Sequence, residues 1–168
     1  MKKILLLLLM AMSVCLGGFA QKGRQAVGVD FPFRGVDGTV SYGFGLKYQY
    51  NITDYIGVEP FFQYYVQEED SEYKIVSAIN GNIYFLGPNR FRPYVFLGTG
   101  YARVCEDLYE GTGGYQDYDN GMLIQSGFAF DYRISYSWSW QLVIGGQMLL
   151  GTDNFSSIYA STGFTYNF

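Results

Sequence analysis

Apolar and polar side chains alternate with a period of two residues along most of this chain. In one stretch Val40, Tyr42, Phe44, Leu46, Tyr48 and Tyr50 alternate with Ser41, Gly43, Gly45, Lys47, Gln49 and Asn51. Successive side chains of a strand point to opposite faces, so this pattern predicts a strand with one apolar and one polar face. Similar stretches between turn-forming residues predict eight strands. Their ranges are 25–33, 39–51, 55–67, 72–86, 93–105, 121–133, 138–150 and 157–168.

Charged side chains indicate which face meets lipid. The charges of the predicted strands share the mixed polar face: Asp30, Lys47, Glu59, Lys74, Asp131 and Arg133. A soluble barrel of lipocalin type has the reverse arrangement, with charges outside and apolar side chains inside. We therefore predict an all-β fold, an eight-stranded antiparallel up-and-down transmembrane β-barrel, with these six charges as a polar network in the lumen.

The fifth predicted strand does not fit this pattern cleanly. It has apolar residues in both registers, so the sequence leaves its orientation open, and Gly98, Gly100 and Ala102 are our guess for the inward residues. Arg103, near the end of this strand, is the one charge that does not fall clearly on the polar face.

The connections add two expectations. A short turn at 52–54 would pair Asn51 with Tyr55, which would set Lys47 opposite Glu59 as an inward ion pair. Links at 87–92 and 134–137 are also short, whereas the first link and the fifth, 106–120, are longer. Outer-membrane barrels place short turns in the periplasm and longer loops outside.

The outer connections are expected to be acidic. Glu68, Glu69 and Asp70, together with the stretch Asp117 to Gly121, would form an acidic rim. Such a rim is either an ordinary solvated loop region or a place where divalent cations bridge the protein to anionic lipopolysaccharide.

The first twenty residues have the pattern of a cleavable signal peptide. Two lysines precede an apolar run, and small residues end the segment at Gly18 and Ala20. The prediction is therefore a signal peptide at 1–20 and an outer-membrane β-barrel domain at 21–168. A retained membrane anchor is the alternative, although the apolar run is short for a spanning helix. Cys105 would be the one cysteine left, so no internal disulfide is expected.

Composition narrows the possible functions. Seventeen tyrosines, 14 phenylalanines and 22 glycines suit a β-barrel, and a net charge of -4 gives no basic surface for nucleic acid. The chain has no histidine, the usual general base, so we expect no enzymatic activity, no metal site and no cofactor. Ser-Lys or paired-carboxylate chemistry stays possible in principle, because Lys47 and Glu59 share a face.

Three stretches carry a family resemblance: FRPYVFLGTGYA (Phe91 to Ala102), GFAFDYRIS (Gly127 to Ser135) and the aromatic series Phe164, Tyr166 and Phe168. They resemble the small eight-stranded outer-membrane β-barrel family that includes OmpX, OmpW and the OmpA membrane domain. The resemblance implies a monomer in the bacterial outer membrane that contacts outer-membrane lipid and lipopolysaccharide. It also implies that the final aromatics are the signal read by the barrel-assembly machinery.

The family resemblance leaves two functions open. One is a non-enzymatic, structural protein that presents loops at the cell surface. The other is an OmpW-like conduit or binding protein for small hydrophobic molecules. A lumen filled by polar side chains would favour the first, and an apolar upper cavity with a gap in the wall would favour the second.

Overall fold

The computed structural model describes eight antiparallel strands. The described residues are 23–36, 39–67, 73–86, 89–108, 115–150 and 155–168. The strands are β1 (Gln25–Val36), β2 (Thr39–Asn51), β3 (Ile56–Gln67), β4 (Tyr73–Tyr84), β5 (Phe91–Leu108), β6 (Tyr115–Arg133), β7 (Trp138–Leu150) and β8 (Phe155–Asn167). Among these residues no helix is long and apolar enough to cross a membrane. The expected signal peptide lies outside the described residues.

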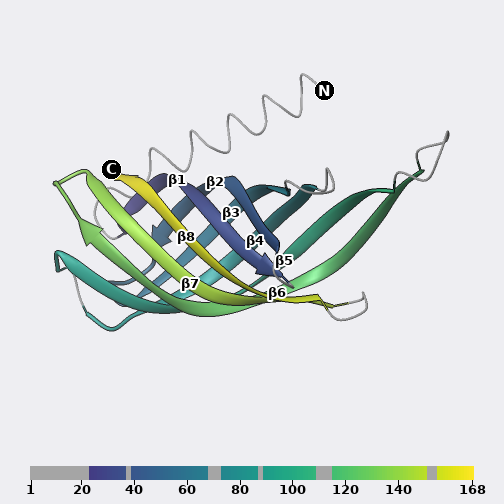
Figure 1. Cartoon of the computed structure of the whole chain (residues 1–168). Helices are drawn as coiled ribbons and strands as arrows, with labels where there is room; N and C mark the ends of the chain where they lie inside the picture. The colour runs from purple at the N-terminus through teal and green to yellow at the C-terminus, as the bar shows by residue number, and fades with distance from the viewer. Residues whose placement is uncertain (1–22, 37–38, 68–72, 87–88, 109–114, 151–154) are drawn as a thin grey trace, which may run out of the picture.

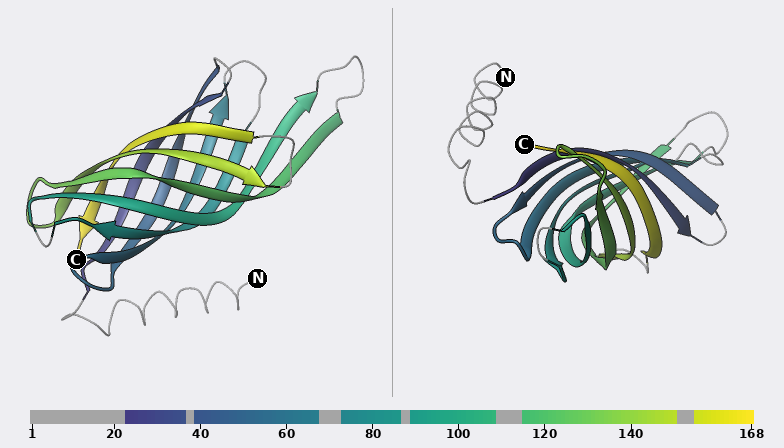
Figure 2. Two further views of the ribbon diagram at one scale, coloured as in Figure 1. Left: turned by 90° about the horizontal axis from the view of Figure 1, so that it is seen from below. Right: turned by 90° about the vertical axis from the view of Figure 1, so that its left-hand side faces the viewer.

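The strands form one closed barrel in which each strand pairs with its neighbours in sequence. The barrel closes where β1 pairs with β8, from Ala26 opposite Asn167 to Gly35 opposite Ile158, and the two strands run side by side in Figures 1 and 2. Closure gives every strand two paired edges, as a wall that lies in lipid requires. The predicted eight-stranded up-and-down barrel is confirmed.

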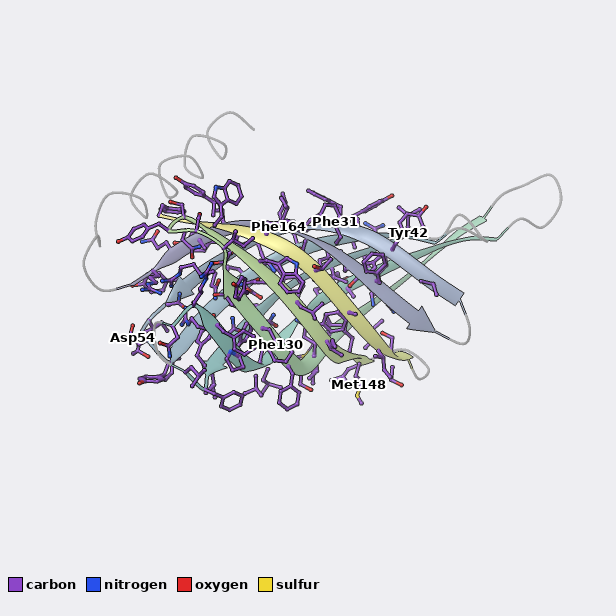
Figure 3. The ribbon with its side chains drawn as sticks, turned by 60° about the vertical axis from the view of Figure 1, so that its left-hand side comes forward. Phe31, Tyr42, Asp54, Phe130, Met148 and Phe164 are labelled. Atoms are coloured by element: carbon purple, nitrogen blue, oxygen red, sulfur yellow. The ribbon has the colours of Figure 1, made fainter. Side chains whose placement is uncertain are left out.

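Side chains alternate between the outside of the barrel and its lumen. On β2, Phe44 is 47% exposed whereas Lys47 is 7% exposed. In Figure 3 the side chains of Phe31, near the top of the view, and Met148, near the bottom, point away from the ribbon. In β5, Gly98 and Ala102 are buried and Gly100 is half-buried on the same face, as guessed, whereas Arg103 is exposed on the outer face.

The end of the barrel far from the termini differs from the expectation of longer loops. The first link occupies only 37–38 and the fifth only 109–114, because β5 and β6 remain paired as far as Leu108 opposite Tyr115. The stretch Asp117 to Gly121, expected in a loop, therefore belongs to β6. These long strands, of 18 and 19 residues, form a hairpin arm that extends beyond the rest of the barrel (Figure 1).

The expected acidic rim is not tested by this arrangement. Residues 68–70 lie outside the described residues, and so do the side chains of Asp117 and Asp119.

The other end carries the connections 52–55, 85–90 and 134–137, the beginning of β1 and the end of β8; we call it the turn end. Hydroxyl groups stabilise two of its turns. Thr53 Oγ1 accepts hydrogen bonds from the backbone N–H groups of Tyr55 (3.2 Å) and Ile56 (3.0 Å), and Ser135 Oγ accepts one from the N–H of Trp138 (3.2 Å). Such side-chain bonds replace backbone partners that a tight turn leaves open.

Candidate functional site

The lumen contains most of the charged residues selected from the sequence. Asp30, Lys47, Glu59, Lys74 and Asp131 are buried there, none more than 7% exposed. Arg133 is half-buried and lies at the last residue of β6, so it belongs to the rim of the turn end.

The expected placement of Lys47 directly opposite Glu59 is wrong, because the register of β2 against β3 differs by two residues. Asn51 pairs with Gly57, and Lys47 pairs with Phe61. The carboxylate of Glu59 instead accepts a hydrogen bond from Asn80 Nδ2 at 3.4 Å. A shift by two residues keeps every side chain on its predicted face, which is why the alternation did not reveal it.

One register row carries a chain of hydrogen bonds around the inside of the wall. The row consists of Glu59, Asn80, Gly98, Gln125 and Gln147, on consecutive strands from β3 to β7. Gln147 Nε2 donates to Gln125 Oε1 (3.1 Å), and Gln125 Nε2 donates to Asn80 Oδ1 (2.6 Å). The second bond passes over β5 at Gly98, where no side chain blocks it.

A second row has the same arrangement. Asp30 on β1 pairs with Gly45 on β2, which pairs with Gln63 on β3. Gln63 Nε2 donates to Asp30 Oδ2 across the glycine at 2.6 Å, and Ser161 Oγ donates to the same oxygen at 3.0 Å. Because the bonds to Asp30 come from β3 and β8, they join strands on both sides of β1.

A third set of hydrogen bonds crosses the lumen. Gln141 Nε2 on β7 donates to Gln49 Oε1 on β2 at 3.2 Å, although β8 and β1 lie between these strands in the wall. Gln49 Nε2 in turn donates to the hydroxyl of Tyr84 on β4. Amide side chains are suited to such chains because each has both donors and an acceptor. These bonds occupy the interior where an open pore would pass.

The sequence reasoning missed two buried arginines, Arg34 and Arg92. The guanidinium carbon of Arg92 lies 3.9 Å from the centroid of the Tyr84 ring, and its Nη2 donates to the carbonyl of Asp54 at 3.2 Å. Arg92 is also the register partner of Asp131, so the opposite charge lies on the neighbouring strand. Both arginines fell just outside the predicted strand ranges, although extending the alternation by one residue would have placed them inward.

Apolar side chains fill much of the remaining lumen in two clusters. One lies toward the end opposite the turns: Phe61, Tyr65, Val76, Ala78, Ala102, Leu123 and Leu149. The other consists of Tyr84, Tyr94, Phe96, Ala129, Val143 and Tyr159. Within the described residues no group of three or more His, Cys, Asp or Glu side chains could hold a metal ion. The arrangement mainly joins strands to one another by hydrogen bonds and apolar contacts.

A hollow of about 620 Å³ opens in the wall of β6, β7 and β8. Its outward-facing lining residues include Ser126, Gly146 and Ile158, all exposed. The strands beneath it remain paired, with Ile158 opposite Gly146 and Gly146 opposite Ser126. The lining also includes the buried, lumen-facing side chains of Gln125, Gln147 and Ser157, so residues of both faces of the wall border the hollow although the backbone pairing is continuous.

The outer wall is apolar around the barrel, as a surface in contact with lipid acyl chains must be. The three aromatics selected as an assembly signal lie on this wall: Phe164, Tyr166 and Phe168 are 44%, 42% and 51% exposed. Tyr166 packs edge-on against Trp138, with ring centroids 5.3 Å apart. These positions suit membrane-interface aromatics, and they do not test the assembly role.

Comparison with known proteins supports the fold. No protein-family model matches the chain, and no curated protein matches its sequence. Solved structures do match. The N-terminal β-barrel domain of Pseudomonas aeruginosa OprF is 18% identical, with a TM-score of 0.62 over 88% of this chain and 100% of that one. Neisserial surface protein A (NspA) is 12% identical, with a TM-score of 0.69 over 87% and 97%. Ail, the attachment invasion locus protein of Yersinia pestis, is 16% identical, with a TM-score of 0.59 over 88% and 100%. The chain thus has the fold of the small eight-stranded outer-membrane β-barrels.

Proposed function

We propose that this protein is a non-enzymatic outer-membrane barrel that serves as a closed, rigid anchor for segments presented at the cell surface. The observation that carries the proposal is the hydrogen bonding across the lumen, from Gln141 through Gln49 to Tyr84. Eight strands enclose an interior that side chains can fill, so a lumen bridged in this way has no continuous aqueous path.

The absence of catalysis is part of the same proposal. The chain has no histidine, and the buried carboxylate of Glu59 lies beside amides, with Asn80 as its hydrogen-bond donor. The second possible pair of catalytic groups is the Glu59 carboxylate and the Lys47 ammonium, which are buried on neighbouring strands. Buried charges of this kind more often fill a protein interior than act as a general acid and base.

The paired arm of β5 and β6 supports a presenting role, because it holds a connection away from the barrel. Ail, one of the similar structures, is described as an attachment invasion locus protein, and it has been solved in complex with the heparin analogue sucrose octasulfate. The arm of this chain carries Glu106, Asp107, Asp117 and Asp119, so a polyanion is not the partner that we propose.

The proposal extends to the barrel's surroundings. Outer-membrane lipid and lipopolysaccharide would contact the apolar wall, the barrel-assembly machinery would handle the chain during biogenesis, and the barrel would act as a monomer. A conduit for small hydrophobic molecules remains the second candidate, and the apolar cluster around Leu123 and Leu149 would be its upper path. The hollow in the wall of β6 to β8 supports this candidate in that lumen-facing Gln125 and Gln147 line it, whereas the continuous strand pairing there weighs against an exit.

Conductance and uptake measurements test the two candidates together. The refolded barrel in a planar bilayer should show no stepwise conductance, with a general porin as positive control. Cells that overproduce it should take up an apolar fluorescent probe at the rate of cells with an empty vector. Stable conductance would contradict the closed anchor, and faster probe uptake without conductance would favour the conduit.

A further inference from the structure

A second hollow, of about 350 Å³, lies at the rim of the turn end. Its lining includes two arginines and three aromatic rings: Arg24, Arg133, Tyr136, Tyr166 and Phe168. We call it the rim pocket. Arg24 precedes β1 and Arg133 ends β6, so the two cations come from segments far apart in sequence.

The walls of the rim pocket are held by backbone hydrogen bonds. The carbonyl of Arg24 accepts a bond from the N–H of Asn51 (3.0 Å), and the N–H of Arg133 donates to the carbonyl of Arg90 (2.8 Å). On the third side the N–H of Asn167 donates to the carbonyl of Ser137 (2.7 Å). A pocket fixed in this way needs little ordering when a ligand binds.

The rim pocket keeps a net positive charge. Its lining holds the guanidinium groups of Arg24 and Arg133 and no acidic side chain, and the one carboxylate in it is the terminal carboxylate of Phe168. Among the described residues neither guanidinium forms an ion pair with a side chain. Asp131, two residues from Arg133, points into the lumen and is buried. Two guanidinium groups in one lining, against a single carboxylate, favour an anion with several oxygen acceptors.

The position of the rim pocket indicates the source of that anion. Both tryptophans of the chain, Trp138 and Trp140, lie on β7 near this rim, and Tyr136 in the adjacent turn is 97% exposed. Tryptophan and tyrosine gather where the acyl region of a bilayer meets its headgroups. The pocket therefore opens at headgroup depth, with Tyr166 and Phe168 on the side that faces the acyl chains.

We propose that the rim pocket binds the phosphate of an anionic phospholipid in the leaflet at the turn end. Arg24 and Arg133 would hold the phosphate oxygens, and the rings of Tyr166 and Phe168 would contact the first acyl carbons. This inference rests on the membrane placement in the proposed function and goes beyond it, because a closed anchor needs no lipid site.

The test uses the folded barrel in maltoside micelles, titrated with short-chain phosphatidylglycerol. Native mass spectrometry counts bound lipid, and tryptophan fluorescence gives the affinity, because Trp138 contacts Tyr166 in the pocket wall. One phosphatidylglycerol should be retained, and phosphatidylcholine and glycerol phosphate should each bind much more weakly. Arg24→Gln and Arg133→Gln should each weaken phosphatidylglycerol binding about fivefold.

Arg103→Gln is the matched control. Arg103 is an exposed arginine near the opposite end of β5, far from the rim pocket and outside its lining. This variant should bind phosphatidylglycerol as the parent does. Arg90→Gln is not suitable, because Arg90 Nε donates to the carbonyl of Arg133 at 3.1 Å and so helps to hold the pocket. Equal binding of the two phospholipids, or an equal loss in Arg103→Gln and Arg24→Gln, would overturn the proposal. Equal binding of glycerol phosphate would show that the pocket takes free phosphate instead of a lipid.

If Arg133→Gln folds poorly, Arg24→Gln still tests the proposal. The Arg24 side chain is exposed and makes no hydrogen bond within the described residues, so its replacement should not disturb folding. Circular dichroism and the shift of the folded band on cold electrophoresis establish folding of each variant. The titration in micelles is independent of conductance, so it distinguishes failure of the lipid site from failure of the closed anchor.

Discussion

Asn80 on β4 accepts a hydrogen bond of 2.6 Å from Gln125 on β6, although β5 runs between the two strands. Gly98 is the β5 residue between them, and a Cβ at this position would lie 2.0 Å from Asn80 Oδ1. Gly45 likewise lies between Asp30 and Gln63, and a Cβ added at Gly45 would lie 2.1 Å from Asp30 Oδ1. In both rows a glycine on the middle strand makes room for a bond between its two neighbours.

Gly98→Ala should therefore destabilise the barrel. The added methyl group would displace the Asn80 amide and break its bond to Gln125, which leaves buried polar atoms without partners and costs about 1 to 3 kcal/mol. The free energy of unfolding, measured by urea titration in lipid vesicles, gives the effect. Gly146→Ala is the control, because a Cβ there has no atom within 4 Å.

The mechanism can be separated from general strain at Gly98. In an Asn80→Ala background the nearest clash partner is absent and only the Ile79 carbonyl oxygen, 2.9 Å from the added Cβ, stays close, so Gly98→Ala should cost less than it does in the parent. The same loss in both backgrounds would show that the lost hydrogen bond is not the cause.

Arg92→Lys should destabilise the barrel more than Arg90→Lys does. The Arg92 guanidinium is buried, stacks 3.9 Å from the Tyr84 centroid and donates to the Asp54 carbonyl, and a lysine ammonium cannot reproduce this planar contact. We expect a loss of about 1 to 2 kcal/mol at Arg92 and under about 0.5 kcal/mol at exposed Arg90. Urea midpoints for the two variants that agree within error would contradict this reading.

Phe62→Arg tests the lipid-facing wall. Phe62 is 46% exposed on β3 and pairs with Leu46 and Ser77, well inside the strand. An arginine there should cost about 2 to 4 kcal/mol of unfolding free energy in vesicles, because it would meet acyl chains. Tyr136→Arg, in a turn, should change stability little. If both variants refold with parental stability, Phe62 does not face lipid.

Phe168→Ala addresses assembly. The substitution keeps the backbone N–H that donates to the Gln25 carbonyl at 3.0 Å, and Phe168 is half-exposed, so the refolded barrel should lose only about 1 kcal/mol. The family resemblance implies that the assembly machinery recognises this ring. The amount of the Phe168→Ala protein in the outer membrane, measured by immunoblotting, should therefore fall sharply. Phe62→Ala, which removes an equally exposed ring, is the control. Unchanged levels in Phe168→Ala would leave the ring as a lipid contact alone.

The alternation along the chain was sufficient for the fold because it depends only on which face a residue occupies. Phe44 and Lys47 lie where the pattern predicted, and so does Glu59 on β3. The alternation could not predict the register between strands. The turn at 52–55 pairs Asn51 with Gly57 instead of the expected Tyr55, and a shift by two residues changes the cross-strand neighbours without changing the face of any side chain.

The hydrogen bonds of the lumen could not be predicted either, because they too depend on the register between strands. The contact between Asn80 and Gln125 depends on three strands in register and on an absent side chain at Gly98. The sequence shows a glycine among apolar residues, a feature with many causes. Inward tyrosines such as Tyr84 and Tyr94 were equally hidden, because tyrosine suits both a lipid interface and a filled lumen.

The hydrogen bond between Ser161 and Asp30 has a consequence for how the barrel folds. It joins residues 131 positions apart in the chain, and the bond between Gln141 and Gln49 spans 92 positions. Contacts of such separation pay a large loop-closure entropy, so they form after the local hairpins. Until β8 meets β1, these polar groups must hydrogen-bond to water. Strand closure is therefore the step at which these groups exchange water for partners inside the barrel. Ser161→Ala should then mainly speed unfolding, while the folding rate stays nearly unchanged, as stopped-flow unfolding and refolding rates would show.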